Sequence, residues 1–185
     1  MLAIVAKVVN PLNKVRQIRQ YDATPVADDA LRQLLEVARW TGSSRNSQPW
    51  HFLVVTDRAK LKQVSDLRPN INWVAAAPLA IAIVLDGDAE LSESYDEGRV
   101  TERLLIAATM LGLGGGTAHY GTAEHQAAAK KILGIPQEKA ARSLVTIGRP
   151  TSVKDPRPNP RKGGRKPLTE IVSYERWGKI TPGSP

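Results

Sequence analysis

Two short apolar runs constrain the fold of this chain more than any other feature. Residues 52–56 (FLVVT) and residues 79–85 (LAIAIVL) are almost continuously apolar and are bounded by polar or turn-forming residues. Runs of this length are typical of strands that are buried on both faces. Residues 143–147 (SLVTI) form a third run of the same kind. The sequence therefore predicts a sheet that is covered on both faces.

Helical patterns fill the segments between these runs. Thr24 is expected to be the N-cap of a helix that has a proline in its first turn and ends near Trp40. Shorter helices are expected over residues 59–67 and 123–133. The longest helix is expected over residues 95–111, where apolar side chains occupy most of the circumference, as in a central helix.

Composition narrows the possible chemistry. The chain has 185 residues and no cysteine, which excludes disulfides, thiol nucleophiles and iron–sulfur clusters. Redox chemistry would therefore need an organic cofactor or a metal, and the three histidines form no metal-binding pair, so no metal site is predicted. The longest apolar run, residues 73–85, is too short to span a bilayer, and no signal peptide is predicted. The absence of cysteine is compatible with a reducing cytosol, and a cytoplasmic protein is expected.

The C-terminal region has a composition of its own. Residues 150–185 contain seven of the 13 prolines, and their eight basic and three acidic residues give +5 of the net charge of +8. We expect a single domain over residues 1–150 and a basic, proline-rich arm over residues 151–185 that belongs to the same domain. The arm contains an amphipathic stretch, residues 167–177, which must dock on another surface.

The positive charge leaves a nucleic-acid-binding protein as an alternative. Such a protein needs aromatic side chains for stacking or a helix that reads the bases. The arm offers only two aromatic residues, Tyr174 and Trp177.

A glycine-rich stretch, residues 112–116 (GLGGG), follows the long predicted helix. It does not match the dinucleotide fingerprint, because that pattern would need glycine in place of Thr117 and because the fingerprint follows a strand. We interpret the stretch as a helix end followed by a close approach of backbone. Its amide groups could still face a ligand.

Residues 42–50 (GSSRNSQPW) form a polar loop that ends in a large aromatic residue and leads into a predicted strand. The serine, asparagine and glutamine side chains could present several neutral donors and acceptors to a flat heteroaromatic ligand. An ordinary connection between a helix and a strand is the alternative.

Two basic clusters could bind an anion. Arg16 and Arg19 are three residues apart and would share a face if the segment were helical, which suits forked contacts with a phosphate. Residues 161–166 (RKGGRK) interleave basic residues with glycine. A solvated basic face and a solvated linker are the alternatives.

Taken in order, these segments resemble the nitroreductase family of FMN enzymes. Residues 16–21 (RQIRQY) are similar to the opening motif of the family, and residues 42–52 (GSSRNSQPWHF) are similar to its second motif. Ala-Pro before the central strand and Leu-Gly-Leu-Gly after the core helix follow in the family order, as do Leu-Gly-Ile-Pro, Ile-Gly-Arg-Pro and Arg-Lys-Pro-Leu. The likeness extends from about Leu12 to Trp177, and Asn-x-Gln-Pro-Trp is its most specific element.

The resemblance implies an α+β fold in which a mixed or antiparallel central sheet is flanked by helices. It also implies an intertwined homodimer with an extended C-terminal arm and two FMN molecules at the interface. Arg16, Arg19 and Arg165, together with Lys162, would hold the FMN phosphate. Gln17 would meet the ribityl–phosphate region, where the family has serine.

Further contacts with the flavin ring are implied in the same way. Three loop residues of the partner subunit would line the ring: Ser43, Ser44 and Asn46. Asn70 would contact the pyrimidine edge. Residues 117–121, with Tyr120 and Gly121 among them, would pass over the ring near its N5 atom.

The implied activity is that of an FMN-dependent NAD(P)H oxidoreductase. Hydride would pass from NADH or NADPH through flavin N5 to a nitroaromatic, a quinone or a similar small acceptor in a ping-pong cycle. The flavin would perform the chemistry, so no catalytic side chain is implied. The same fold and flavin could instead serve flavin destruction, dehalogenation or ring oxidation, and the motifs do not separate these reactions.

Overall fold

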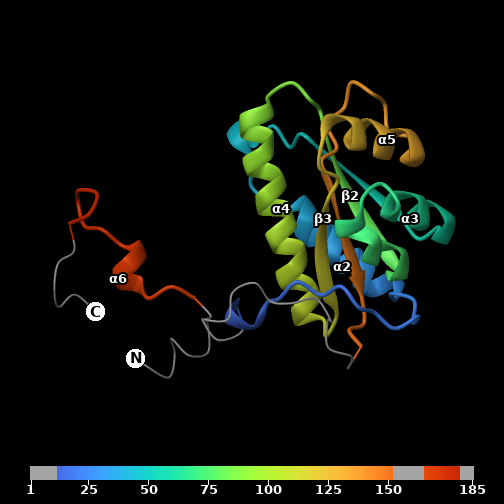
Figure 1. Cartoon of the computed structure of the whole chain (residues 1–185), viewed down its shortest axis with the longest axis horizontal. Helices are drawn as coiled ribbons and strands as arrows, with labels where there is room; N and C mark the ends of the chain where they lie inside the picture. The colour runs from blue at the N-terminus through green and yellow to red at the C-terminus, as the bar shows by residue number, and fades with distance from the viewer. Residues whose placement is uncertain (1–11, 152–164, 180–185) are drawn as a thin grey trace. The chain divides into compact units, whose positions relative to one another are not determined.

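The computed structural model of the chain describes residues 12–151 and 165–179. The chain separates into two compact units, Met1–Lys154 and Asp155–Pro185, and each is described by itself. The first unit carries the sheet and the helices that surround it (Figure 1).

Among the described residues, four strands form one antiparallel sheet in the order β1-β2-β4-β3. The strands are β1 (Trp50–Val55), β2 (Leu79–Leu85), β3 (Gly114–His119) and β4 (Ser143–Gly148). The two apolar runs pair with each other, since Phe52 lies opposite Ile83 in the register of β1 and β2. The predicted α+β class with an antiparallel sheet is confirmed.

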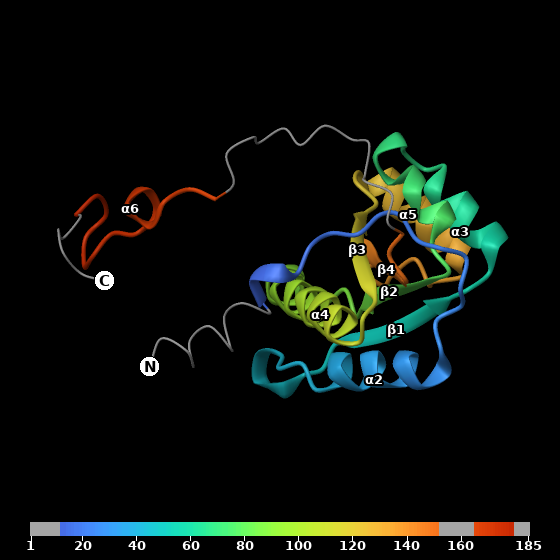
Figure 2. The same ribbon diagram turned by 90° about the horizontal axis from the view of Figure 1, so that it is seen from below.

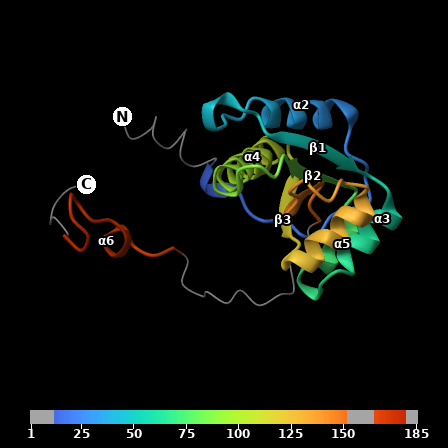
Figure 3. The ribbon, with the colours of Figure 1, turned by 90° about the horizontal axis from the view of Figure 1, so that it is seen from above.

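Helices cover both faces of this sheet, as Figures 2 and 3 show from opposite sides. One face carries α2 (Asp28–Arg39) and α4 (Glu90–Met110). The other face carries α3 (Arg58–Ser65), the 3₁₀ helix η2 (Pro69–Ala76) and α5 (Ala123–Leu133). The fold is therefore a sheet between two helical layers, as the apolar runs predicted.

The core divides according to the alternation of side chains along β2. Ile81 and Ile83 pack with the layer of α2 and α4, whereas Ala80 and Ala82 pack with the layer of α3 and α5. All seven residues of β2 are buried, because both of its faces are covered. No described helix has the length and apolar character needed to cross a membrane.

The start of the first predicted helix was wrong. The helix begins at Asp28, after Ala27, and Thr24 is not its N-cap. The Asp22 carboxylate accepts the Thr24 backbone N–H at 2.9 Å, which places Thr24 in a turn that precedes the helix. The predicted end of the helix near Trp40 is confirmed, because Trp40 is the C-cap.

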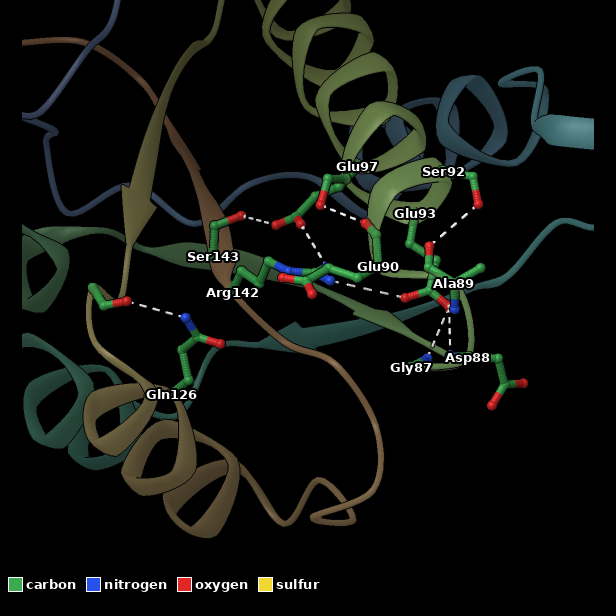
Figure 4. Close-up of polar contacts among 12 residues, drawn as sticks. Gly87, Asp88, Ala89, Glu90, Ser92, Glu93, Glu97, Gln126, Arg142 and Ser143 are labelled. Atoms are coloured by element: carbon green, nitrogen blue, oxygen red, sulfur yellow. Dashed lines mark hydrogen bonds and ion pairs between the residues drawn. The ribbon is translucent and has the colours of Figure 1, made fainter.

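The long helix begins five residues earlier than predicted. Its first turns are held by a buried carboxylate, because Glu93 Oε1 accepts backbone N–H bonds from three residues, Gly87, Asp88 and Ala89, at 2.9–3.4 Å (Figure 4). The prediction relied on an apolar pattern, whereas a hydrogen-bonded carboxylate stabilises the start of this helix.

The glycine-rich stretch was only partly interpreted correctly. Gly112 has φ +72° just after α4, as expected of a helix end, but Gly114 and the two glycines after it form the first half of β3. The predicted close approach of backbone is present: Ile18 N donates to Gly115 O at 2.7 Å. A Cβ atom at Gly116 would collide with the Ile18 carbonyl oxygen.

The second unit contains one short described helix, α6 (Leu168–Ile171). Leu168, Ile171 and Trp177 are exposed, and Trp177 is fully so. The amphipathic stretch predicted in the arm thus presents its apolar side chains to the surface.

Candidate functional site

The N-terminal segment 16–21 lies along β3 and supplies the first side chains of the candidate site. Gln17 bridges to Gly115, and its Oε1 accepts the Thr117 backbone N–H at 2.8 Å. The segment is extended rather than helical, so Arg16 and Arg19 do not share a helical face as the spacing allowed. Arg16 is exposed, and its guanidinium donates to the Val15 carbonyl at 2.7 Å.

A buried hydroxyl pair fixes this segment to the sheet. Tyr21 donates to Ile18 O at 2.5 Å, and Thr146 Oγ1 lies 2.7 Å from the phenol oxygen. Thr146 in turn donates to Gly116 O at 3.1 Å. Burial raises the pKa of Tyr21, so the phenol stays a donor at neutral pH.

The 3₁₀ helix η2 brings Asn70 next to the same segment. The Arg19 guanidinium lies over the Trp73 ring, 5.7 Å from its centroid. Trp73 donates its indole N–H to Asn70 O at 3.0 Å and also faces Gly116. Two segments far apart in sequence thus meet at β3: the N-terminal segment, which carries Gln17 and Arg19, and η2, which carries Asn70. No pattern in the sequence predicts that Trp73 contacts these residues.

The end of β3 carries a second group of polar contacts. Arg68 donates to His119 O at 3.3 Å, and the Gly121 backbone N–H donates to His119 Nδ1 at 3.0 Å. Gln126 donates to Gly121 O at 3.0 Å (Figure 4). Gly121 has φ +101°, and a Cβ there would meet Arg68 at 2.6 Å, so only glycine fits. Sequence reasoning missed Arg68, since a lone arginine carries no pattern.

Tyr120 points away from the surface. Its side chain is fully buried in the core, where burial and the nearby Glu97 raise the pKa of the phenol. Its hydroxyl has no partner among the described residues. A contact with a ligand would therefore have to use the backbone of Tyr120 rather than its ring.

Figure 4 shows the buried acids that support this end of the sheet. Ser143 Oγ donates to Glu97 at 2.5 Å, and Arg142 lies 3.3 Å from Glu97 and 4.0 Å from Glu93. Ser143 is the ladder partner of His119. The network therefore ties α4 to the end of β3 through β4.

The polar loop after α2 is strained. Residues 44–46 form a single 3₁₀ turn, and three non-glycine residues have left-handed backbones: Arg45 (φ 53°), Asn46 (φ 56°) and Gln48 (φ 50°). Such conformations cost about 1 kcal/mol or more each and cluster at functional sites. Ser43 Oγ accepts the Gln48 N–H at 2.8 Å, and Ser44 and Asn46 are exposed. The backbone geometry of this loop is unlike that of an ordinary connection between a helix and a strand.

The loop and the N-terminal segment lie at different ends of α4. The loop contacts Asp96, whereas Leu12 and Val15 share a cavity of about 230 Å³ with Thr109 and Met110. Thirteen residues separate Asp96 from Thr109, or about 20 Å along the helix axis. The loop therefore lies far along α4 from the start of the N-terminal segment of the same chain.

Two predicted phosphate ligands belong to the arm. Lys162 lies outside the described residues, and Arg165 is an exposed residue of the second unit. Their convergence with Arg16 and Arg19 stays a prediction. Within residues 12–151 and 165–179, no group of three or more histidine and acidic side chains is arranged to hold a metal ion.

The chain has known relatives. A sequence model of the Nitroreductase family matches residues 14–95. A protein of Archaeoglobus fulgidus, named as an inferred NADH dehydrogenase/NAD(P)H nitroreductase, is 35% identical over 147 residues, which are 76% of this chain and 83% of the relative.

Solved structures share the fold. An FMN-dependent nitroreductase from Clostridium difficile has a TM-score of 0.77 at 23% identity, covering 92% of this chain and 100% of the other. An NADPH:FMN oxidoreductase from Vibrio harveyi, solved with NAD⁺, has a TM-score of 0.76 at 22% identity, covering 94% and 79%. At these identities the likeness concerns the fold alone.

Proposed function

The chain belongs to the nitroreductase family, and we propose that it is an FMN-dependent oxidoreductase that uses NADH or NADPH to reduce a nitroaromatic, a quinone or a similar small acceptor. The observation that carries this proposal is the meeting of Gln17, Arg19 and the Asn70 segment at β3. Bound FMN would supply the redox chemistry by taking up electrons from the nicotinamide and passing them to the acceptor in a second step.

The residues at β3 fit FMN. The cofactor needs cations for its phosphate and neutral donors for its ring edge. Arg19 and Arg16 offer the charge, and Gln17 and Asn70 offer amide groups. Thr117 adds a buried hydroxyl with no partner among the described residues.

We propose distinct tasks for these side chains. Arg16 and Arg19, joined by Arg165 and Lys162, would hold the phosphate. The amide oxygen of Gln17 is bonded to Thr117, so its amide nitrogen would face the ribityl–phosphate region. A second set would face the ring: Asn70 at the pyrimidine edge, and the backbone of Tyr120 and Gly121 near N5.

We propose further that the enzyme is a homodimer and that Ser43, Ser44 and Asn46 act on the FMN of the partner subunit. The separation of about 20 Å along α4 between the loop and the start of the N-terminal segment supports this. An apolar face on α2 and α4 supports it as well. Trp40 is 69% and Met110 is 79% exposed, beside a cavity of about 400 Å³.

A visible spectrum of the purified protein tests the proposed function. We expect a yellow protein, or an apoprotein that becomes yellow on titration with FMN. Anaerobic addition of NADH and of NADPH in separate samples should bleach the flavin band and reveal the preferred donor. A protein that stays colourless after FMN titration would contradict the proposal.

A further inference from the structure

A buried acid of α4 anchors the strained loop. The Asp96 side chain is 2% exposed, and its Oδ2 accepts the backbone N–H of Ser44 at 3.2 Å. Its Oδ1 accepts a bond from the Arg99 guanidinium at 3.1 Å. The same guanidinium donates to Gly42 O at 3.3 Å, so acid and arginine together hold the start of the loop.

The neighbouring acids of α4 serve other segments. Glu93 binds the backbone before the helix, and Glu97 binds Ser143 and Arg142 (Figure 4). Asp96 lies between them in sequence, and the hydrogen bond to Ser44 directs it to the loop instead. Of these three acids, it is therefore the one that controls the loop.

The strain in the loop explains why a charged anchor is needed. Arg45, Asn46 and Gln48 are held in left-handed conformations that an unrestrained chain rarely adopts. A hydrogen bond to an ionised, buried acceptor is stronger than one to a neutral acceptor. Without it, the loop would relax to other backbone conformations and its side chains would leave their positions.

We propose that Asp96 is a positioning residue whose carboxylate sets residues 43–48 in the conformation that lines the flavin ring of the partner subunit. The inference rests on the proposed function and adds to it a residue outside the family motifs. Asp96 contacts the loop backbone, so it would act through the loop.

The test compares Asp96→Asn and Asp96→Ala with wild type and with Asp66→Asn, a control that removes an acid from an exposed pair with Lys62 on α3. Two quantities are measured: the dissociation constant of FMN by fluorescence quenching, and the rate of trypsin cleavage after the exposed Arg45 by mass spectrometry. Circular dichroism and sedimentation check that each variant folds and assembles as wild type does.

We expect FMN to bind about tenfold more weakly to Asp96→Asn, with a larger loss for Asp96→Ala, as for removal of a charge-assisted bond. Cleavage after Arg45 should become faster in the same order, and Asp66→Asn should match wild type. Wild-type affinity in both Asp96 variants, whatever their cleavage rate, would overturn the inference.

The remaining outcomes are also decisive. If wild type and Asp66→Asn bind no FMN, the proposed function fails and this inference fails with it. If the Asp96 variants do not fold, Arg99→Gln takes their place, because the Arg99 side chain is 57% exposed and its removal leaves no buried gap. Weaker FMN binding and faster cleavage then support the inference, and wild-type values overturn it.

Discussion

The hydroxyl of Tyr21 holds the N-terminal segment against the sheet. It joins Ile18 to Thr146, and Thr146 continues the chain of bonds to Gly116. Because the segment carries Gln17 and the arginines, this buried pair of hydroxyls sets their distance from β3. A phenylalanine would fill the same space and leave the Ile18 carbonyl without its donor and the Thr146 hydroxyl without its partner.

We therefore expect Tyr21→Phe to lower the free energy of unfolding by about 1–2 kcal/mol at pH 7, as for a lost buried hydrogen bond. FMN should bind more weakly as well, because the segment is released. Urea unfolding and FMN titration measure the two effects. Tyr95→Phe is the control, since Tyr95 is 68% exposed; equal losses in both variants would contradict the assigned role.

The pH dependence of the same variant has a defined sign. The pKa of Tyr21 is raised on folding, so its contribution is present below pH 10 and is lost at higher pH, where the phenol of the unfolded chain ionises. Wild type should thus lose up to about 1.4 kcal/mol more per pH unit above pH 10 than Tyr21→Phe. Tyr120 is present in wild type and in Tyr21→Phe, so it does not change the difference between the two pH curves. Parallel curves would contradict this prediction.

The sequence predicted some of the residues that meet at β3 and not others. Gln17 and Arg19 belong to the first motif and Asn70 follows from the resemblance, and the folded sheet brings their two segments together. Arg68 acts through one carbonyl contact that only the folded chain creates. The shared helical face suggested for Arg16 and Arg19 was wrong, because backbone pairing with β3 keeps the segment extended.

The glycines of β3 are a condition for this packing. A Cβ on Gly116 would collide with Ile18 O and would lie 3.0 Å from the Trp73 ring. At Gly98, in the middle of α4, an added Cβ would meet nothing within 4 Å. The effect of a glycine-to-alanine substitution can therefore be compared at Gly116 and at Gly98.

We expect Gly116→Ala to destabilise the protein by about 1–3 kcal/mol and to weaken FMN binding, because the N-terminal segment must shift. Gly98→Ala should stabilise the protein by up to about 1 kcal/mol through its helix propensity. Urea unfolding and FMN titration of both variants are the measurements. A neutral effect at Gly116 would show that the segment is not held as described.

Elements with apolar patterns were predicted well and the others were not. The bounds of β2 and α5 match the prediction, because apolar runs with clear breakers define both. The start of α4 was missed since buried acids stabilise its first turns. No strand was predicted over β3, because the three glycines of its first half give no hydrophobic period.

For the whole molecule, the proposed exchange of loops between subunits can be tested by mixing two defective variants. Arg19→Ala removes a proposed phosphate ligand, and Asp96→Asn is expected to release the loop. A mixed dimer would hold one site with both parts intact and one with neither. Random reassociation should therefore restore about a quarter of the wild-type activity.

The control for this experiment mixes Arg19→Ala with Arg16→Ala. Both changes lie on the same side of the proposed site, so every mixed dimer has two damaged sites and no activity should return. No recovery in the first mixture although mixed dimers form would show that the loop acts within its own chain. Recovery in the control would show that Arg16 and Arg19 do not serve the same site.

The distance between loop and N-terminal segment along α4 also has a consequence for gene expression. If every active site needs residues from two subunits, a monomer is inactive. At low concentration the amount of dimer rises with the square of the chain concentration. Doubling synthesis would then nearly quadruple the reducing capacity of a sparsely expressing cell. Transcription alone would act as a steep control on this enzyme, without any dedicated effector.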